Sequence, residues 1–186
     1  HLSLRRQRQM CIRDSPIRFV DQTKQKFDEI LQRLRKRFGY ILVDTPASMS
    51  FEHLILTAIA DAVIYVAEAN DDSVEATVLT ARGLKRFMDV KALGSVLNKL
   101  PPHVDEGEWV RKLARVAPVL GVIPDDDLVD DAFRRNIPVT AAYPNSPASR
   151  ALEEIAHKIL MRKLKPSRVP ERIERAIKVT AKRVGK

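Results

Sequence analysis

The stretch AVIYVAEANDDSVEATVLTARGLKRFMDVKALGSVLNK (residues 62–99) decides the fold. Its apolar runs at 62–67 and 93–97 have the length and continuity of strands that are buried on both faces, and residues 73–88 between them have helical periodicity. A strand, a helix and a second strand in this order form a right-handed crossover unit with parallel strands. We therefore expect this stretch to form part of a parallel sheet.

The same alternation of helices and strands continues on both sides of this stretch. The further predicted elements are a helix from Asp21 to Phe38 that ends at Gly39, a strand at 40–43, helices at 51–60 and 108–115, a strand at 119–123, a short helix at 128–135, a loop through Pro138, Pro144 and Pro147, and helices at 148–164 and 171–184. Strands that alternate with helices indicate an α/β fold, with a doubly wound, mainly parallel sheet flanked by helices.

The net charge of +9 is concentrated at the two ends of the chain. Residues 1–15 carry four Arg and one Asp, residues 158–186 carry eleven basic and two acidic residues, and the rest has 18 basic and 21 acidic residues. The body is therefore mildly acidic, and the ends have the charge of interaction segments or tails. A single cysteine excludes a disulfide framework, and no apolar run reaches the roughly 20 residues of a transmembrane helix.

The first fifteen residues, HLSLRRQRQMCIRDS, differ in character from the rest of the chain. They contain no apolar core after their basic residues, so they are not a secretory signal, and they resemble translated adapter sequence. We expect 1–15 to be a non-native or disordered tail, 16–165 to be part of a domain whose native chain is longer, and 166–186 to be a basic C-terminal helix. A basic nucleic-acid-binding arm is the alternative for 1–15.

Polar residues follow three of the predicted strands, as Asp44-Thr45-Pro46, Asn98-Lys99 and Pro124-Asp125. In open parallel sheets, ligands bind at the carboxyl ends of the strands. An Asp in this position suits Mg²⁺ beside nucleotide phosphates, and an Asn amide suits a purine edge. Taken one at a time, Asp44 could instead cap a loop or helix, and Asn98 and Pro124-Asp125 could be turn residues.

Taken in order, these segments resemble the MinD/ParA branch of the P-loop ATPases over about residues 20–165. YILVDTPA (40–47) is similar to the switch-II strand and loop of that family, and SVLNK (95–99) to the strand that ends in its base-recognition Asn. VLGVIPDDDLVDDAFRRNIPV (119–139) and PNSPAS (144–149) resemble two further blocks of the family.

The resemblance implies an ATP-dependent dimerising switch that acts in spatial positioning of the division site or in partition. By this resemblance Asp44 has the catalytic and metal role, near Mg²⁺ and the attacking water. Asn98 reads adenine, Pro124 and Asp125 line the base pocket, and Pro46 belongs to the nucleotide site. The implied cofactors of the parent protein are ATP and Mg²⁺, and its implied partner is a second copy of itself.

Three departures from the family pattern affect this interpretation. Ser48 stands where the family has Gly, and Asn136 replaces another Gly, although Asn tolerates the left-handed region well. No G-x-x-x-x-G-K-[ST] loop or lysine-rich variant occurs in the sequence. Because that loop positions the phosphates, we expect the parent protein to be an ATPase and these 186 residues alone not to hydrolyse ATP.

The C-terminal segment has the pattern of a basic amphipathic helix. Ile173, Ala176, Ile177, Thr180 and Val184 share one face, and the candidate membrane-binding residues Arg172, Arg175, Lys178, Lys182 and Arg183 lie beside or opposite it. Such a helix indicates binding to an anionic membrane surface, which implies a cytoplasmic protein peripheral to the inner face of the cell membrane. The alternatives are non-specific DNA binding and a helix that packs on the body.

A second function stays open beside the ATPase switch. It is a nucleotide-free α/β adaptor that docks to a membrane or a partner through its basic C-terminal helix. The sequence does not identify a protein partner in either case.

Overall fold

The computed structural model describes residues 26–27, 29–45 and 51–162. The chain divides into two compact units, one formed by 1–58 with 170–186 and the other by 59–169.

In the first unit, the structure confirms a helix at 26–27 and 29–35 but not the strand predicted at 40–43. The helix ends where the backbone N–H groups of Arg37 and Phe38 both donate to the Leu34 carbonyl, at 2.9 Å. Residues 40–45 then form neither helix nor strand, and Leu42 is 88% exposed. The predicted strand is wrong because an apolar run becomes a strand only where a neighbour pairs with its N–H and C=O groups. Helix α2 (Phe51–Ile59) comes next in the chain, as predicted.

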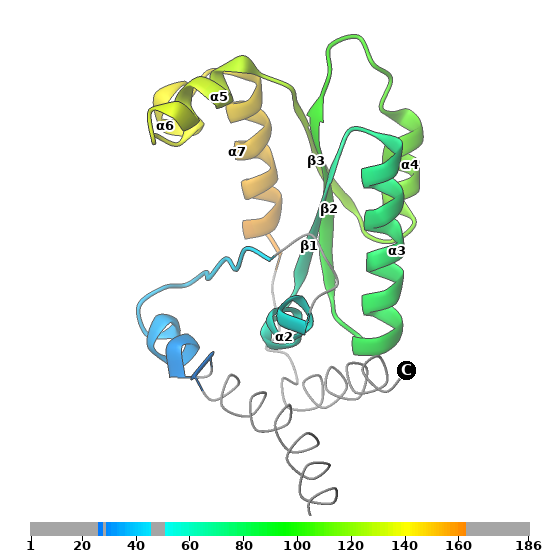
Figure 1. The fold of residues 1–186 in the computed structure, drawn as a ribbon. Coiled ribbons are helices and arrows are strands. Elements are labelled where there is room, and N and C mark those ends of the chain that lie inside the picture. Colours follow the sequence, from blue (N-terminus) through cyan, green and yellow to red (C-terminus); the bar gives the residue numbers. More distant parts are fainter. Residues whose placement is uncertain (1–25, 28, 46–50, 163–186) are drawn as a thin grey trace, which may run out of the picture. The chain divides into compact units, whose positions relative to one another are not determined.

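The second unit contains a parallel sheet of three strands, in the order β1-β2-β3 (Figure 1). The strands are β1 (Val63–Glu68), β2 (Ala92–Leu100) and β3 (Val119–Pro124). The three strands predicted in this region are thus confirmed, although β2 continues three residues beyond the predicted end at Leu97. The extra residues pair with both neighbours, since Asn98 lies opposite Glu68 and Leu100 lies opposite Pro124.

Helices cover both faces of this sheet, which confirms the doubly wound α/β fold. Helices α3 (Asp71–Met88) and α4 (Gly107–Ala114) pack on one face, and α7 (Pro147–Leu160) packs on the other (Figure 1). Between β3 and α7 the chain forms α5 (Asp127–Arg134) and α6 (Val139–Ala142). Helix α6 lies in the segment predicted to be a loop, because a single turn between prolines has no helical periodicity to reveal it.

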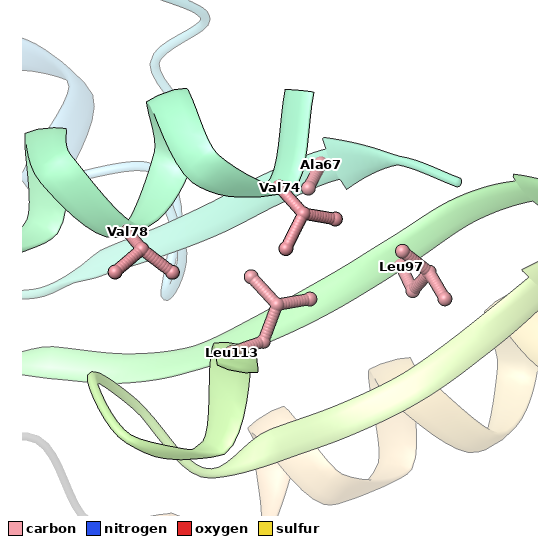
Figure 2. Close-up of a cluster of buried hydrophobic side chains, with 5 residues drawn as sticks. All are labelled: Ala67, Val74, Val78, Leu97 and Leu113. Carbon is pink, nitrogen blue, oxygen red and sulfur yellow. The ribbon is translucent and has the colours of Figure 1, made fainter. Parts of the chain in front are cut away.

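Two apolar clusters, one on each face, hold these layers together. Figure 2 shows the cluster on the α3 and α4 side, which consists of Ala67, Val74, Val78, Leu97 and Leu113. On the α7 side, Val96 and Leu120 pack with Ile155. Because Val96 and Leu97 are adjacent in β2, their membership in opposite clusters shows that this strand is buried on both faces.

Two glycines allow close packing on the α7 side. A β-carbon on Gly121 would lie 2.6 Å from the Ile155 side chain, and one on Gly94 would lie 2.4 Å from the Leu120 side chain. Both distances are too short for real contacts. Gly121 therefore allows α7 to approach the sheet closely, and Gly94 leaves room for the Leu120 side chain of the neighbouring strand β3.

Candidate functional site

The carboxyl ends of the three strands meet at one edge of the sheet in the second unit. The Ala69 N–H donates to the Asn98 carbonyl at 2.9 Å, and the Asp125 N–H donates to the Leu100 carbonyl at 2.8 Å. These bonds place Asn98, Pro124 and Asp125 along the same edge, where ligands bind in parallel sheets. Three of the predicted site residues are therefore brought together.

A bulge interrupts β2 at this edge. Leu97 lies opposite Val122 and Leu100 opposite Pro124, so Asn98 and Lys99 together face the single residue Ile123. Lys99 has a φ of 56°, in the left-handed region that costs a residue with a side chain about 1–2 kcal/mol. Bulges and such backbone outliers concentrate beside functional sites, where they redirect a side chain. The outlier thus adjoins the Asn that the sequence indicated as the base reader.

The Asn98 side chain is half-buried. Within the part of the chain that the structure describes, its amide makes no hydrogen bond. A half-buried amide that lacks a partner is unfavourable, by up to about 1–3 kcal/mol when water is fully excluded. The amide offers two donors and an acceptor, which is what the edge of a purine base requires.

An ion pair links the bulge in β2 to the end of β1. The Lys99 Nζ donates to Glu68 Oε1 at 3.0 Å. This hydrogen bond and the Glu68 charge raise the pKa of Lys99, and the charges of Asp130 and Asp125 raise it further. Neither Lys99 nor Glu68 was assigned a role from the sequence. The position of Glu68 could have identified it as a residue of this edge, because Glu68 follows an apolar run just as Asn98 does.

Asp126 fixes the loop after β3. One of its carboxylate oxygens accepts from the Leu128 N–H at the start of α5, and the other accepts from the Ala148 N–H at the start of α7, both at 3.1 Å. Burial acts to raise the pKa of Asp126, but the N–H groups of Ala148 and Leu128 and the Ser146 hydroxyl outweigh it and lower that pKa. Asp126 therefore ties both helices to the loop that carries Asp125. Its role was not predicted from the sequence, because three aspartates precede Leu128 and each fits the pattern of a helix N-cap.

The expected left-handed conformation at Asn136 is confirmed. Its φ is 53°, and the next N–H, that of Ile137, donates to the Ala132 carbonyl at 3.0 Å to close α5. Asn is among the side chains that adopt this conformation most readily. The replacement of Gly at this position therefore preserves the end of the helix.

The other predicted residues lie in the first unit or outside the described residues. Asp44 is exposed and belongs to the first unit. Pro46, Ser48 and the basic residues Arg172, Arg175, Lys178, Lys182 and Arg183 lie outside the described residues. Among the described residues, no group of three or more His, Cys, Asp or Glu side chains is arranged to hold a metal ion. No described helix has the length and apolar character to cross a membrane.

Comparisons with known proteins agree on one family. The model of the family described as "Cellulose biosynthesis protein BcsQ" matches residues 9–160. The chain is 29% identical over 137 residues to the uncharacterized ATP-binding protein MJ0547 of Methanocaldococcus jannaschii, a match that covers 73% of this chain and 52% of that protein. It is also 29% identical over 150 residues to the septum site-determining protein MinD of Helicobacter pylori, with 74% and 54% covered.

A solved structure shows the same fold. The septum site-determining protein MinD of Pyrococcus horikoshii, in complex with Mg-ADP, superposes with a TM-score of 0.63 at 20% identity and covers 73% of this chain and 56% of its own. The chain spans about half the length of the curated relatives it matches.

Proposed function

Because this chain belongs to the MinD/ParA-type family of P-loop ATPases, the family to which the matching BcsQ model also belongs, we propose that its sheet edge forms the adenine side of an ATP site. The site serves an ATP-dependent dimerising switch that acts in spatial positioning, either of the division site or in partition. Asn98 reads the base, Pro124 packs against it, and Asp125 lines the pocket through its backbone.

One observation carries this proposal: the half-buried Asn98 amide, which has no hydrogen-bond partner among the described residues, stands at a backbone bulge at the carboxyl edge of a parallel sheet. A purine edge would supply the hydrogen-bond partners that this part of the chain does not. The bulge supports the assignment because a regular strand would have continued to alternate its side chains between the two helical layers.

The residue types also fit the cofactors proposed for the parent protein. An Asn amide offers one donor and one acceptor, which match the acceptor nitrogen and the donor amino group on the edge of adenine. Mg²⁺ in nucleotide sites is held by one or two carboxylates and by the phosphates themselves, so a single carboxylate at Asp44 suits it. When bound, Mg²⁺ would neutralise charge on the phosphates, and Asp44 would hold the ion or its water, with Pro46 in the loop beside it. The description of MJ0547 as ATP-binding and the Mg-ADP complex of the Pyrococcus protein support these cofactors.

The test of the base site is a chimera in which the N-terminal segment of the Helicobacter pylori MinD precedes residue 16. We expect ATP to bind, and Asn98→Ala to reduce the preference for ATP over GTP by about 1–3 kcal/mol, or roughly 5- to 150-fold. Competition binding with the two nucleotides measures this. Asn145→Ala, which changes an exposed Asn in the same unit, is the matched control and should leave the preference unchanged. An unchanged preference in Asn98→Ala removes Asn98 from the site.

The wider proposal concerns assembly and location. The chimera should form a homodimer with ATP and remain a monomer with ADP, which sedimentation measures. We place the parent protein in the cytoplasm, with its basic C-terminal segment at the inner face of the cell membrane. The alternative ligand of that segment is DNA. Binding measured in parallel to anionic vesicles and to duplex DNA distinguishes a membrane role from a DNA role.

A further inference from the structure

The bulge in β2 places a Lys beside Asn98 at the carboxyl edge of the sheet. Leu97 belongs to the apolar cluster of Figure 2, and Leu100 packs against the same cluster. Residues three apart in a regular strand lie on opposite faces, so the bulge is what returns Leu100 to the face of Leu97. A regular strand would direct Lys99 toward the cluster, where its charge would be unfavourable. The bulge instead leaves the Lys99 side chain 62% exposed, next to the proposed base reader.

An unrestrained ammonium group at this position would change which base the site prefers. Guanine carries a carbonyl oxygen, O6, where adenine carries an amino group, and Lys donates readily to that oxygen and to the neighbouring N7. An ammonium group has three donors and no acceptor, so it cannot pair with the amino group of adenine. Contact between Lys99 and a base would therefore favour guanine and oppose the preference that Asn98 provides.

Carboxylates restrain and neutralise this Lys. The Lys99 Nζ lies 3.0 Å from Glu68 Oε1, and Glu68 is the residue of β1 that lies opposite Asn98. Glu68 raises the pKa of Lys99, and the charges of Asp130 and Asp125 raise it further. Three carboxylates and one ammonium group give this part of the edge a net charge of −2. The edge is therefore acidic although it contains a Lys.

The backbone at Glu68 is fixed on both sides of the residue. The Glu68 N–H donates to Ser73 Oγ at 2.9 Å, and the Glu68 carbonyl accepts from the Asn70 N–H at 2.8 Å. The Asn70 side chain in turn accepts from the Ser73 N–H at the start of α3, also at 2.8 Å. The Glu68 side chain therefore extends toward Lys99 from a backbone that is anchored to the first turn of α3.

We propose that Glu68 is a specificity-determining residue of the base site, which restrains Lys99 and so keeps the edge selective for adenine over guanine. This proposal rests on the proposed base-reading role of Asn98. Glu68 is a positioning residue, because it acts through Lys99. The acidic surround acts in the same direction, since a carboxylate accepts from the amino group of adenine and cannot donate to the O6 of guanine.

The test compares Glu68→Gln with the unchanged sequence in the chimera described above. We expect Glu68→Gln to bind GTP about two- to tenfold more tightly, the range of one net hydrogen bond, without a gain in ATP affinity. A purely structural role of Glu68 would instead weaken the binding of both nucleotides. Adding Lys99→Met to Glu68→Gln should return the GTP affinity to its original value, because Met is unbranched and uncharged. Competition binding measures each affinity.

The matched control is Glu108→Gln, which removes the carboxylate of another exposed ion pair, at 2.8 Å from Lys112 on α4, and should change neither affinity. A second measurement uses the full chain without nucleotide. Because Glu68 raises the pKa of Lys99, Glu68→Gln should lower that pKa in an NMR titration of the Lys99 side chain, and Glu108→Gln should not.

Unchanged or weaker GTP binding in Glu68→Gln overturns the proposal, as does an unchanged pKa of Lys99, because the ion pair then does not restrain the Lys in solution. The outcome for Asn98→Ala separates the two levels of the argument. If that variant loses its preference for ATP while Glu68→Gln gains no GTP affinity, the base site stands and the role of Glu68 is wrong. If Asn98→Ala keeps the preference, the base site is wrong and the role of Glu68 falls with it.

Discussion

Two apolar runs of similar composition have opposite fates in this molecule. Residues 63–68, VIYVAE, form β1 and pair with β2, whereas residues 40–44, YILVD, form no strand and leave Leu42 exposed. Both runs are apolar and end in an acidic residue. The difference is the neighbour, since β2 accepts and donates the hydrogen bonds of β1. Strand formation at these positions therefore depends on pairing more than on composition.

Amide exchange gives the sharpest test of this comparison. The amides of Ser95 to Leu97, inside the sheet, should exchange at least about a thousandfold more slowly than in free peptide, because they open only with the domain. The amides of Ile41 to Val43 should exchange within about tenfold of the free-peptide rate. Hydrogen exchange followed by mass spectrometry or NMR measures both. Strong protection at 41–43 would mean that this run does find a strand partner.

The two leucines of these regions should differ in their effect on stability. Leu97 is fully buried in the cluster of Figure 2, so Leu97→Ala should lower the free energy of unfolding by about 2–5 kcal/mol. Leu42→Ala, at an exposed position, should change it by less than about 0.5 kcal/mol. Urea denaturation followed by circular dichroism gives both values. Equal losses in the two variants would show that the 40–45 segment contributes to a core.

The smallest expected effect compares two aspartates. Asp126 accepts from two backbone N–H groups, and an Asn amide in its place has only one acceptor oxygen, so at pH 7 Asp126→Asn should lower the free energy of unfolding by about 0.5–1.5 kcal/mol, the net value of one hydrogen bond. Asp44 is exposed, so Asp44→Asn should change it almost not at all. The pKa of Asp126 is lowered in the folded state, so its contribution is present above the ordinary Asp value of about 3.9 and is lost as the pH falls through the folded value. Urea midpoints at pH 7, 5 and 3 should therefore converge for the wild type and Asp126→Asn. A constant difference across this range contradicts the assignment.

The sequence predicted the elements whose neighbours are close along the chain. The strands at 63–68, 92–100 and 119–124 were found because apolar runs alternate with helices of clear period. The strand at 40–43 was predicted wrongly because its pattern carries no information on whether a partner is present. The bulge at Asn98 and Lys99 was also beyond the sequence, since a positive φ at a Lys results from its contacts to β1 and β3 and not from its own preference.

Within the candidate site, the position of Asn98 was predictable and its surroundings were not. A polar residue directly after an apolar run marks the carboxyl edge of a sheet, so Asn98, Pro124 and Asp125 could be named in advance. Asp126 could not be distinguished from its neighbours in the run of three aspartates at 125–127. Its role depends on Ala148, which lies 22 residues further along the chain.

The close contact at Gly121 links layer spacing to the geometry of the sheet edge. Ile155 of α7 occupies the space that a side chain at 121 would need. A methyl group there would push α7 away from the sheet. The displacement would lengthen the hydrogen bond from the Ala148 N–H to Asp126. The loop with Asp125 and the start of α5 would then lose their anchor, although neither touches Gly121. The absence of a side chain at Gly121, in the middle of β3, thus helps to position the loop that follows β3.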